Sequence, residues 1–329
     1  MLKFLLSYSL FCSFTVFASP KIDKWSITEA DEKGSLWIRQ PKSHKGHKNV
    51  LRLWKHRETN RYYLRKVAKP HSIRAEAVGA RLFKKFDLPV PETYLNNENP
   101  KKPTLMIEYF DGLRPISSKE DYIRNKDLFL KAMLLDILLY NYDRHKLNIR
   151  LKTNGDVVFI DHGAGLTSKA QGGPHQYPGQ VTVDQVQDIL SLVINKNRAV
   201  NSGYSYWVQW EELKKGRLIF SEKKQDQKKI RQAIAELEQV LTDEVIENEI
   251  ISPVFSALSP KDSKSEVRSR LYSVGHFFIS KVSSKFSAAR STLKEIYDDY
   301  DGNQKTFFIS RLKSRRDSLV KLLKDRLTP

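Results

Sequence analysis

Alternating apolar and polar residues dominate the first third of the chain and predict strands there. Successive side chains of a strand point to opposite faces, so a period of two indicates a sheet with one buried face. The pattern fits a meander with a turn at Thr59-Asn60, followed later by a strand that ends at Gly112: residues 35–40, 50–54, 61–68 and 104–112. The segment 74–86 instead has helical spacing, with an apolar face formed by Ala75, Val78, Leu82 and Phe86.

The rest of the chain is predicted to be mostly helical. Residues 127–140 are apolar nearly all round, which is typical of a deeply buried helix. A short strand is expected at 156–161, and residues 163–179 hold five of the fourteen glycines, which predicts a loop. From about residue 181 the pattern is helical to the end, most clearly at 227–241 and 307–327. The order indicates an α+β protein with an antiparallel sheet first and a helical part after it.

The net charge of the chain indicates which classes of molecule it would bind. The chain has 57 Lys and Arg against 38 Asp and Glu, a net charge of +19, which favours phosphate-bearing partners. Residues 39–85 alone contain fifteen basic residues and two acidic ones, so an anionic membrane surface is an alternative partner, with nucleic acid ranked behind it. The single cysteine, Cys12, excludes a disulfide framework and a cysteine-based zinc site.

The N-terminus has the pattern of an export signal. Lys3 precedes an apolar run from Phe4 to Phe17, and the small residues Val16 and Ala18 suit a signal peptidase. We therefore expect residues 1–18 to be a signal peptide and the protein to be exported, either periplasmic or secreted. A buried N-terminal helix or a wrongly assigned start is the alternative. No later stretch has eighteen uninterrupted apolar residues, so no transmembrane helix is expected.

Three polar residues near the middle of the chain have the spacing that phosphoryl transfer needs. Asp143 follows the buried helix, Asn148 comes five residues later, and Asp161 ends the next strand before a glycine turn. One carboxylate can orient or deprotonate an attacking hydroxyl, while an amide oxygen and a second carboxylate can hold Mg²⁺. Each residue alone is as easily a turn or capping residue. Their combination predicts a catalytic Asp143 and a metal site at Asn148 and Asp161.

These motifs also resemble a known family. The segment N-Y-D-R-H-K-L-N followed by I-D-H-G is similar to the catalytic loop and metal-binding turn of the atypical kinase superfamily, where the histidine (here His145) follows the aspartate. That branch includes phosphatidylinositol 3/4-kinases, HipA-type bacterial kinases and secretory-pathway kinases. The segment V-P-E-T at 90–93 is similar to the same branch. The resemblance covers roughly residues 35–166, and the C-terminal half does not contribute to it.

The resemblance implies a two-lobed protein-kinase-like fold that binds ATP and Mg²⁺. The N-lobe would span 19–110 and the helical C-lobe 111–329, including a C-terminal helical extension. Lys66 would hold the α- and β-phosphates, with Glu76 as its partner. Glu108 and Tyr109 would lie in the hinge strand that meets the adenine. The implied activity is transfer of the ATP γ-phosphate to a hydroxyl of a lipid or protein.

Two departures from the family pattern leave alternatives open. No glycine-rich loop covers the phosphates, since the connection at 41–49 has only Gly46. This absence favours, as an alternative, an inactive pseudokinase that serves as a basic binding scaffold. The basic residue that would bind the phosphates is also ambiguous, because Arg65 and Lys69 are alternatives to Lys66. Transfer of AMP instead of phosphate is a further alternative. Glu76 has a second interpretation, as an exposed acid in the first helical turn. Asp136, a lone acid in the apolar helix, is expected to bond to the catalytic-loop backbone.

Overall fold

A computed structural model provides the structure of the chain. It describes residues 37–45, 50–97, 99, 101–116, 118–141, 143–144, 147–166, 177–183, 185–186, 223–256 and 303–327. The expected signal peptide, His145 and most of the glycine-rich loop lie outside the described residues. None of the helices in these ranges is long and apolar enough to cross a membrane.

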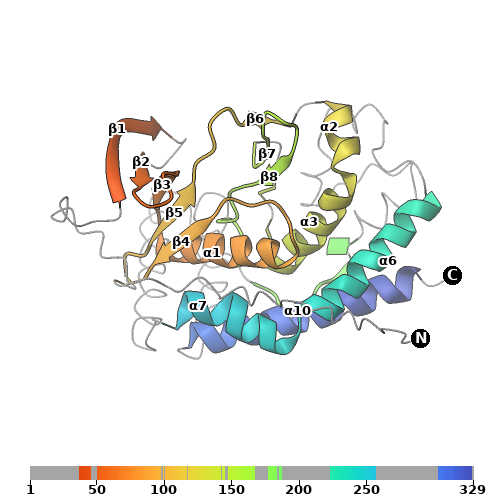
Figure 1. Cartoon of the computed structure of the whole chain (residues 1–329). Helices are drawn as coiled ribbons and strands as arrows, with labels where there is room; N and C mark the ends of the chain where they lie inside the picture. The colour runs from red at the N-terminus through yellow and green to blue at the C-terminus, as the bar shows by residue number, and fades with distance from the viewer. Residues whose placement is uncertain are drawn as a thin grey trace, which may run out of the picture.

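The N-terminal part is an antiparallel sheet of five strands in the order β1-β2-β3-β5-β4 (Figure 1). The strands are β1 (Trp37–Lys45), β2 (Val50–His56), β3 (Tyr62–Val67), β4 (Thr93–Asn96) and β5 (Thr104–Glu108). The meander is confirmed, and Asn60 forms its turn with a left-handed backbone, a conformation that asparagine tolerates. Two predicted ends were wrong. The last strand ends at Glu108, before Gly112, and β1 runs on to Lys45 past an irregularity around Pro41, where the missing N–H of proline is tolerated.

Helix α1 (Pro70–Lys85) lies against this sheet and begins four residues before the predicted start. Proline at the first position of a helix loses nothing, because that N–H has no partner within the helix anyway. The helix contacts β4 and β5 on one side and helix α3 on another. It therefore connects the sheet with the helical part of the molecule.

The helical part surrounds helix α3, and a second, smaller sheet lies beside it (Figure 1). Its helical elements are α2 (Lys119–Arg124), α3 (Lys126–Leu139), α6 (Lys223–Val240), η2 (Val245–Ile251), α7 (Ser252–Phe255) and α10 (Gln304–Leu327). The small antiparallel sheet has the strands β6 (Arg114–Pro115), β7 (Ile149–Leu151) and β8 (Val157–Phe159). The α+β prediction is confirmed, with the sheet-rich part first and the helices after it.

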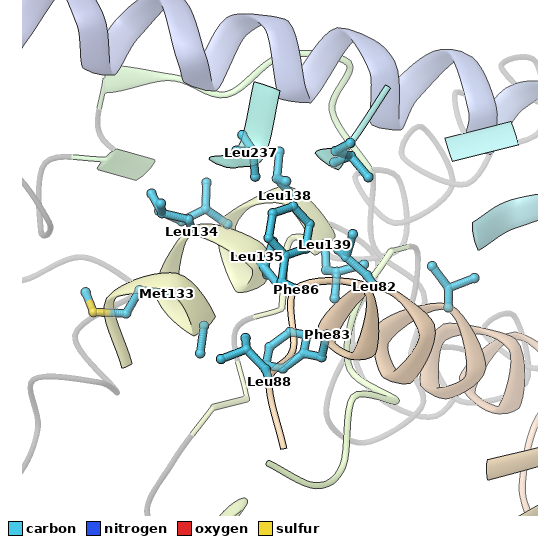
Figure 2. Close-up of a cluster of buried hydrophobic side chains, with 14 of the residues drawn as sticks. Leu82, Phe83, Phe86, Leu88, Met133, Leu134, Leu135, Leu138, Leu139 and Leu237 are labelled. Atoms are coloured by element: carbon cyan, nitrogen blue, oxygen red, sulfur yellow. The ribbon is translucent and has the colours of Figure 1, made fainter. Parts of the chain in front are cut away.

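The hydrophobic core centres on α3, as its apolar sequence predicts. Ten of the fourteen residues of this helix are buried. Figure 2 shows leucines of α3 meeting side chains from α1, such as Leu82 and Phe83, and Leu237 from α6. One continuous cluster of buried residues thus joins α1, through α3, to the C-terminal helices.

Candidate active site

The structure decides which basic residue of β3 faces the candidate site. The Nζ atom of Lys66 lies 2.8 Å from Oε2 of Glu76 and 2.9 Å from Oδ1 of Asp161. Arg65 is on the opposite face of the strand, where its guanidinium stands over the ring of Trp54. Lys69 is exposed and precedes helix α1 as its N-cap. Of the three candidates, Lys66 is therefore the one that meets both carboxylates.

These contacts favour the charged forms of Lys66 and Asp161. Burial alone would lower the pKa of Lys66, but the nearby carboxylates of Glu76 and Asp161 raise it above its usual range. Burial opposes ionisation of Asp161 as well, yet the charge and hydrogen bond of Lys66 lower the pKa of that carboxyl to about 2. Because the folded pKa of Asp161 is below its ordinary 3.8, the stability that this ion pair contributes is present above about pH 4 and is lost as the pH falls toward 2.

Glu76 connects helix α1 to the turn that carries Asp161. Its side chain is 3% exposed, so the interpretation of an exposed first-turn acid was wrong. One carboxylate oxygen accepts the Lys66 ammonium, and the other accepts the backbone N–H of His162 at 2.8 Å. The carboxylate of Asp161, in contrast, is 48% exposed on its side chain, so a ligand arriving from solvent can reach it.

The candidate catalytic residues Asp143 and Asn148 are held by the end of α3. Tyr140 takes a left-handed conformation that stops the helix, and Asn141 then accepts the backbone N–H of Asp143 at 3.1 Å. The side-chain amide of Asn148 donates to the carbonyl of Asp143 at 2.7 Å. The carbonyl of Asn148 also accepts the N–H of Ile160 at 3.0 Å. Asp143 and Asn148 are thereby tied to each other and to the strand that leads into Asp161.

The residue after Asp143 is a buried arginine that was not predicted from the sequence. Arg144 is 1% exposed, and its guanidinium pairs with the fully buried carboxylate of Asp136 at 3.0 Å. It also donates to the carbonyls of Asn148 and Ile160. Asp136 was expected to bond to the loop backbone, and the bonds described for its carboxylate are to side chains of the loop, those of Arg144 and Asn141. A guanidinium has five donors, and here it satisfies a carboxylate and two carbonyls together.

The same guanidinium reaches His162, the residue after Asp161. One of its nitrogens lies 2.8 Å from Nδ1 of His162. Burial and the charge of Arg144 hold the pKa of His162 well below its usual range, so the imidazole is neutral and Nδ1 accepts this bond. Its ring packs edge-on against Phe83 at 4.4 Å between centroids. Arg144 therefore links the catalytic loop to the turn that carries the candidate metal ligand.

Helix α1 approaches this turn closely because glycine stands at position 79. A Cβ placed on Gly79 would lie 2.4 Å from Cβ of His162, far inside van der Waals contact. On the other side of the turn, the hydroxyl of Ser72 donates to the carbonyl of Gly163 at 3.2 Å. The turn at 161–163 is thus packed directly on α1, where the backbone N–H of His162 meets Glu76.

We predict that Gly79→Ala will destabilise the protein by about 1–3 kcal/mol, the usual range for overpacking a core. Helix propensity alone predicts the opposite sign, a gain of about 1 kcal/mol for alanine over glycine inside a helix. Urea unfolding followed by circular dichroism measures the difference. Lys84→Ala, on the exposed face of the same helix, removes an exposed ion pair with Glu92 and should cost no more than about 1 kcal/mol. A stabilised Gly79→Ala variant would contradict the close packing.

The predicted hinge residues have structural partners. Arg61 pairs with the carboxylate of Glu108 at 3.2 Å, and the N–H of Glu92 also donates to it. The backbone N–H of Tyr109 donates to the carbonyl of Tyr62 at 2.8 Å, and that of Glu108 donates to Glu92. The backbone N–H groups of Glu108 and Tyr109 are therefore engaged within the sheet. An adenine ring docked here would meet backbone carbonyls or groups beyond residue 109.

The two residues predicted to hold a metal carry oxygen atoms, which suit a hard cation. Among the described residues, no cluster of three or more His, Cys, Asp or Glu side chains gathers as a metal site. Asn148 and Asp161 would instead supply two oxygen ligands, one of them a carboxylate that stays ionised at neutral pH. Mg²⁺ is commonly held by one or two carboxylates together with substrate phosphates and water. The donor set therefore fits Mg²⁺ that enters together with a polyphosphate.

The chain is similar to solved structures but not to curated sequences. No family model matches the chain, and no curated protein matches its sequence. The chain is similar to a solved structure described as a Helicobacter pylori proinflammatory kinase, CtkA, with 16% identity and a TM-score of 0.42. The match covers 88% of this chain and 95% of that one. In this chain's own elements, an antiparallel sheet with one helix packed on it precedes a mostly helical part, which is the two-lobed, kinase-like α+β arrangement.

Proposed function

We propose that this protein is an ATP-dependent phosphotransferase that moves the γ-phosphate to a hydroxyl of a lipid or protein acceptor. The observation that carries the proposal is the position of Lys66, whose ammonium bonds to Glu76 on α1 and to Asp161 at the end of the small sheet. A strand lysine held by a helix glutamate beside a metal-binding aspartate is the arrangement on which kinases depend. Lys66 and Glu76 come from consecutive elements and are ten residues apart, whereas Asp161 lies 95 residues after Lys66, so the fold must bring it to the other two.

The residues would have separate roles. Lys66 would bind the α- and β-phosphates, held in place by Glu76, while Asn148 and Asp161 hold Mg²⁺. The bound ion supplies positive charge that offsets the charge of the phosphate oxygens. As the acceptor oxygen bonds to the γ-phosphorus, the bond to the β,γ-bridging oxygen breaks and ADP leaves with that electron pair. The acceptor proton passes to the carboxylate of Asp143.

Further parts of the proposal concern where the enzyme acts. The N-terminal pattern of residues 1–18 supports export, and the basic segment 39–85 supports binding to an anionic membrane. A lipid acceptor would agree with both. We place the lobe boundary near residue 110, just after β5, where the chain leaves the large sheet.

The test uses the full chain with Mg²⁺ and ATP labelled separately at the α- and γ-phosphates. Label is followed into the protein itself, a generic protein and mixed phosphoinositides. We expect γ-label in an acceptor, and at least about a 100-fold loss in Asp143→Asn and in Asp161→Asn, since each removes charge at the reacting groups. Asp325→Asn, an exposed aspartate on α10, should retain wild-type transfer.

Each other outcome has a defined meaning. Label from the α-phosphate alone would mean transfer of AMP and would overturn the phosphate-transfer proposal. Nucleotide binding without any transfer would identify the pseudokinase scaffold. Absence of both, with no shift of thermal unfolding by ATP and Mg²⁺, would exclude a nucleotide enzyme.

A further inference from the structure

The C-terminal helix α10 places a fully buried arginine against the end of α3. Arg315 is 0% exposed. Its Nε donates to the carbonyl of Leu138 at 2.9 Å, and a terminal nitrogen donates to the carbonyl of Ile137. The last carbonyls of a helix have no partner within it, and the negative end of the helix dipole favours a cation there. Arg315 therefore caps α3 from outside the helix.

The same guanidinium also holds the end of the loop predicted at 163–179 and the residues that follow it. It donates to the carbonyls of Pro178 and Gln180 at 3.2 and 3.1 Å, and to the side-chain oxygen of Gln185 at 3.3 Å. Ser318, about one turn further along α10, accepts the N–H of Val181 at 2.8 Å. One face of α10 thus fixes this segment and the end of α3 together.

The end of α3 matters because the catalytic loop starts there. Tyr140 ends the helix, and the Arg315 guanidinium stands over its ring at 5.1 Å. Asn141, which accepts the N–H of Asp143, donates its own backbone N–H to the carbonyl of Asp136 in the last turn of α3. A shift of that turn would move Asp143, the proposed proton acceptor, by a similar amount.

We propose that Arg315 is a positioning residue for phosphate transfer, acting through the last turn of α3 on Asp143; this rests on the proposed function. It touches no reacting group. It makes the C-terminal helix, which lies outside the kinase-like motifs, a required part of the catalytic apparatus. The guanidinium is needed as such, because its flat fork reaches four carbonyls and one amide oxygen at once.

The first test separates kcat from KM. We expect Arg315→Met to lower kcat by about 100-fold, the order of loss known for a misplacement of about 1 Å. The KM for ATP should stay within about twofold, because the proposed phosphate-binding Lys66 and Glu76 belong to β3 and α1. Arg315→Lys keeps the charge but lacks the fork, so it should show a smaller loss in kcat with the same unchanged KM. Arg315→Lys also provides the test of the positioning role if Arg315→Met does not fold.

Two variants of the same helix serve as controls. Leu323→Ala removes a fully buried side chain of α10, eight residues from Arg315, and should destabilise the fold while leaving the Arg315 bonds to α3 in place, so its kcat should stay near wild type at temperatures where it is folded. Arg326→Met removes an exposed charge and should change neither constant. If the folded Arg315 variants keep wild-type kcat, or if Leu323→Ala loses as much kcat, the positioning role is wrong.

A second measurement does not depend on activity. Hydrogen exchange in peptides covering residues 137–144 and 177–183 should be faster in the Arg315 variants than in Leu323→Ala, with residues 62–67 unchanged. If the wild-type protein transfers no phosphate, the proposed function fails, while the exchange experiment still decides whether Arg315 holds the loop. Equal exchange in the Arg315 and Leu323 variants would overturn the inference.

Discussion

Lys66→Met is expected to reduce phosphate transfer by at least about 100-fold, the usual loss when one charged group at a reacting centre is removed. Methionine keeps the length of the side chain but cannot donate to Glu76, Asp161 or a phosphate. Transfer of γ-label at saturating ATP, with the KM for ATP measured alongside, checks the result. The thermal unfolding midpoint must be measured too, because the variant leaves Glu76 buried beside Asp161 without its cation.

The two basic residues that the sequence left open as alternatives are the matched controls. Lys69→Met removes an exposed lysine and Arg65→Met removes a cation from the opposite face of β3, so both should retain transfer within a few-fold of wild type. Glu76→Gln keeps an acceptor for Lys66 and should have a smaller effect than Lys66→Met. A loss of activity in Lys69→Met that matched the loss in Lys66→Met would contradict the assignment of the phosphate-binding base.

The backbone elements near the site could largely be predicted, because their patterns are local. Alternation in 61–68 predicts a strand in which Lys66 faces away from Tyr63, and the apolar run 127–140 predicts the buried helix α3. The start of α1 was missed by four residues, since Pro70 was not recognised as its first residue. Alternation alone could not choose between Lys66 and Lys69, because the choice depends on where α1 and Asp161 lie in space.

The supporting charges of the site could not be predicted from pattern alone. Arg144 stands next to Asp143 in a chain with 57 basic residues, so an exposed side chain is the default expectation. Its burial depends on Asp136, eight residues earlier, and on the carbonyl of Ile160, sixteen residues later. The lone acid in an apolar helix was the available signal, and it indicated a buried partner without identifying it. Arg315 gave no such signal, because its partners are mainly backbone carbonyls.

The largest effect on stability is expected at the buried pair of Asp136 and Arg144. Arg144→Met should lower the free energy of unfolding by about 3–5 kcal/mol, because it leaves a buried carboxylate without its cation. The double variant Asp136→Leu/Arg144→Met should lose less than the sum of the two single variants, by about 1–3 kcal/mol, since the residues are in direct contact. Lys131→Met, which removes a partly exposed pair with Glu236, should cost no more than about 1 kcal/mol.

The pH dependence of the Arg144→Met variant tests the cause of its instability. Without Arg144, burial should raise the folded-state pKa of Asp136 above its unfolded value, so the folded state binds a proton that the unfolded state releases. The stability of the variant relative to wild type should then improve as the pH falls from 7.5 to 5, measured by urea unfolding at both pH values. In the double variant, which has no carboxylate at position 136, this improvement should vanish. An Arg144→Met deficit that is equal at both pH values would mean that the loss comes from the hydrogen bonds to Asn148 and Ile160, and that the unpaired charge of Asp136 contributes little.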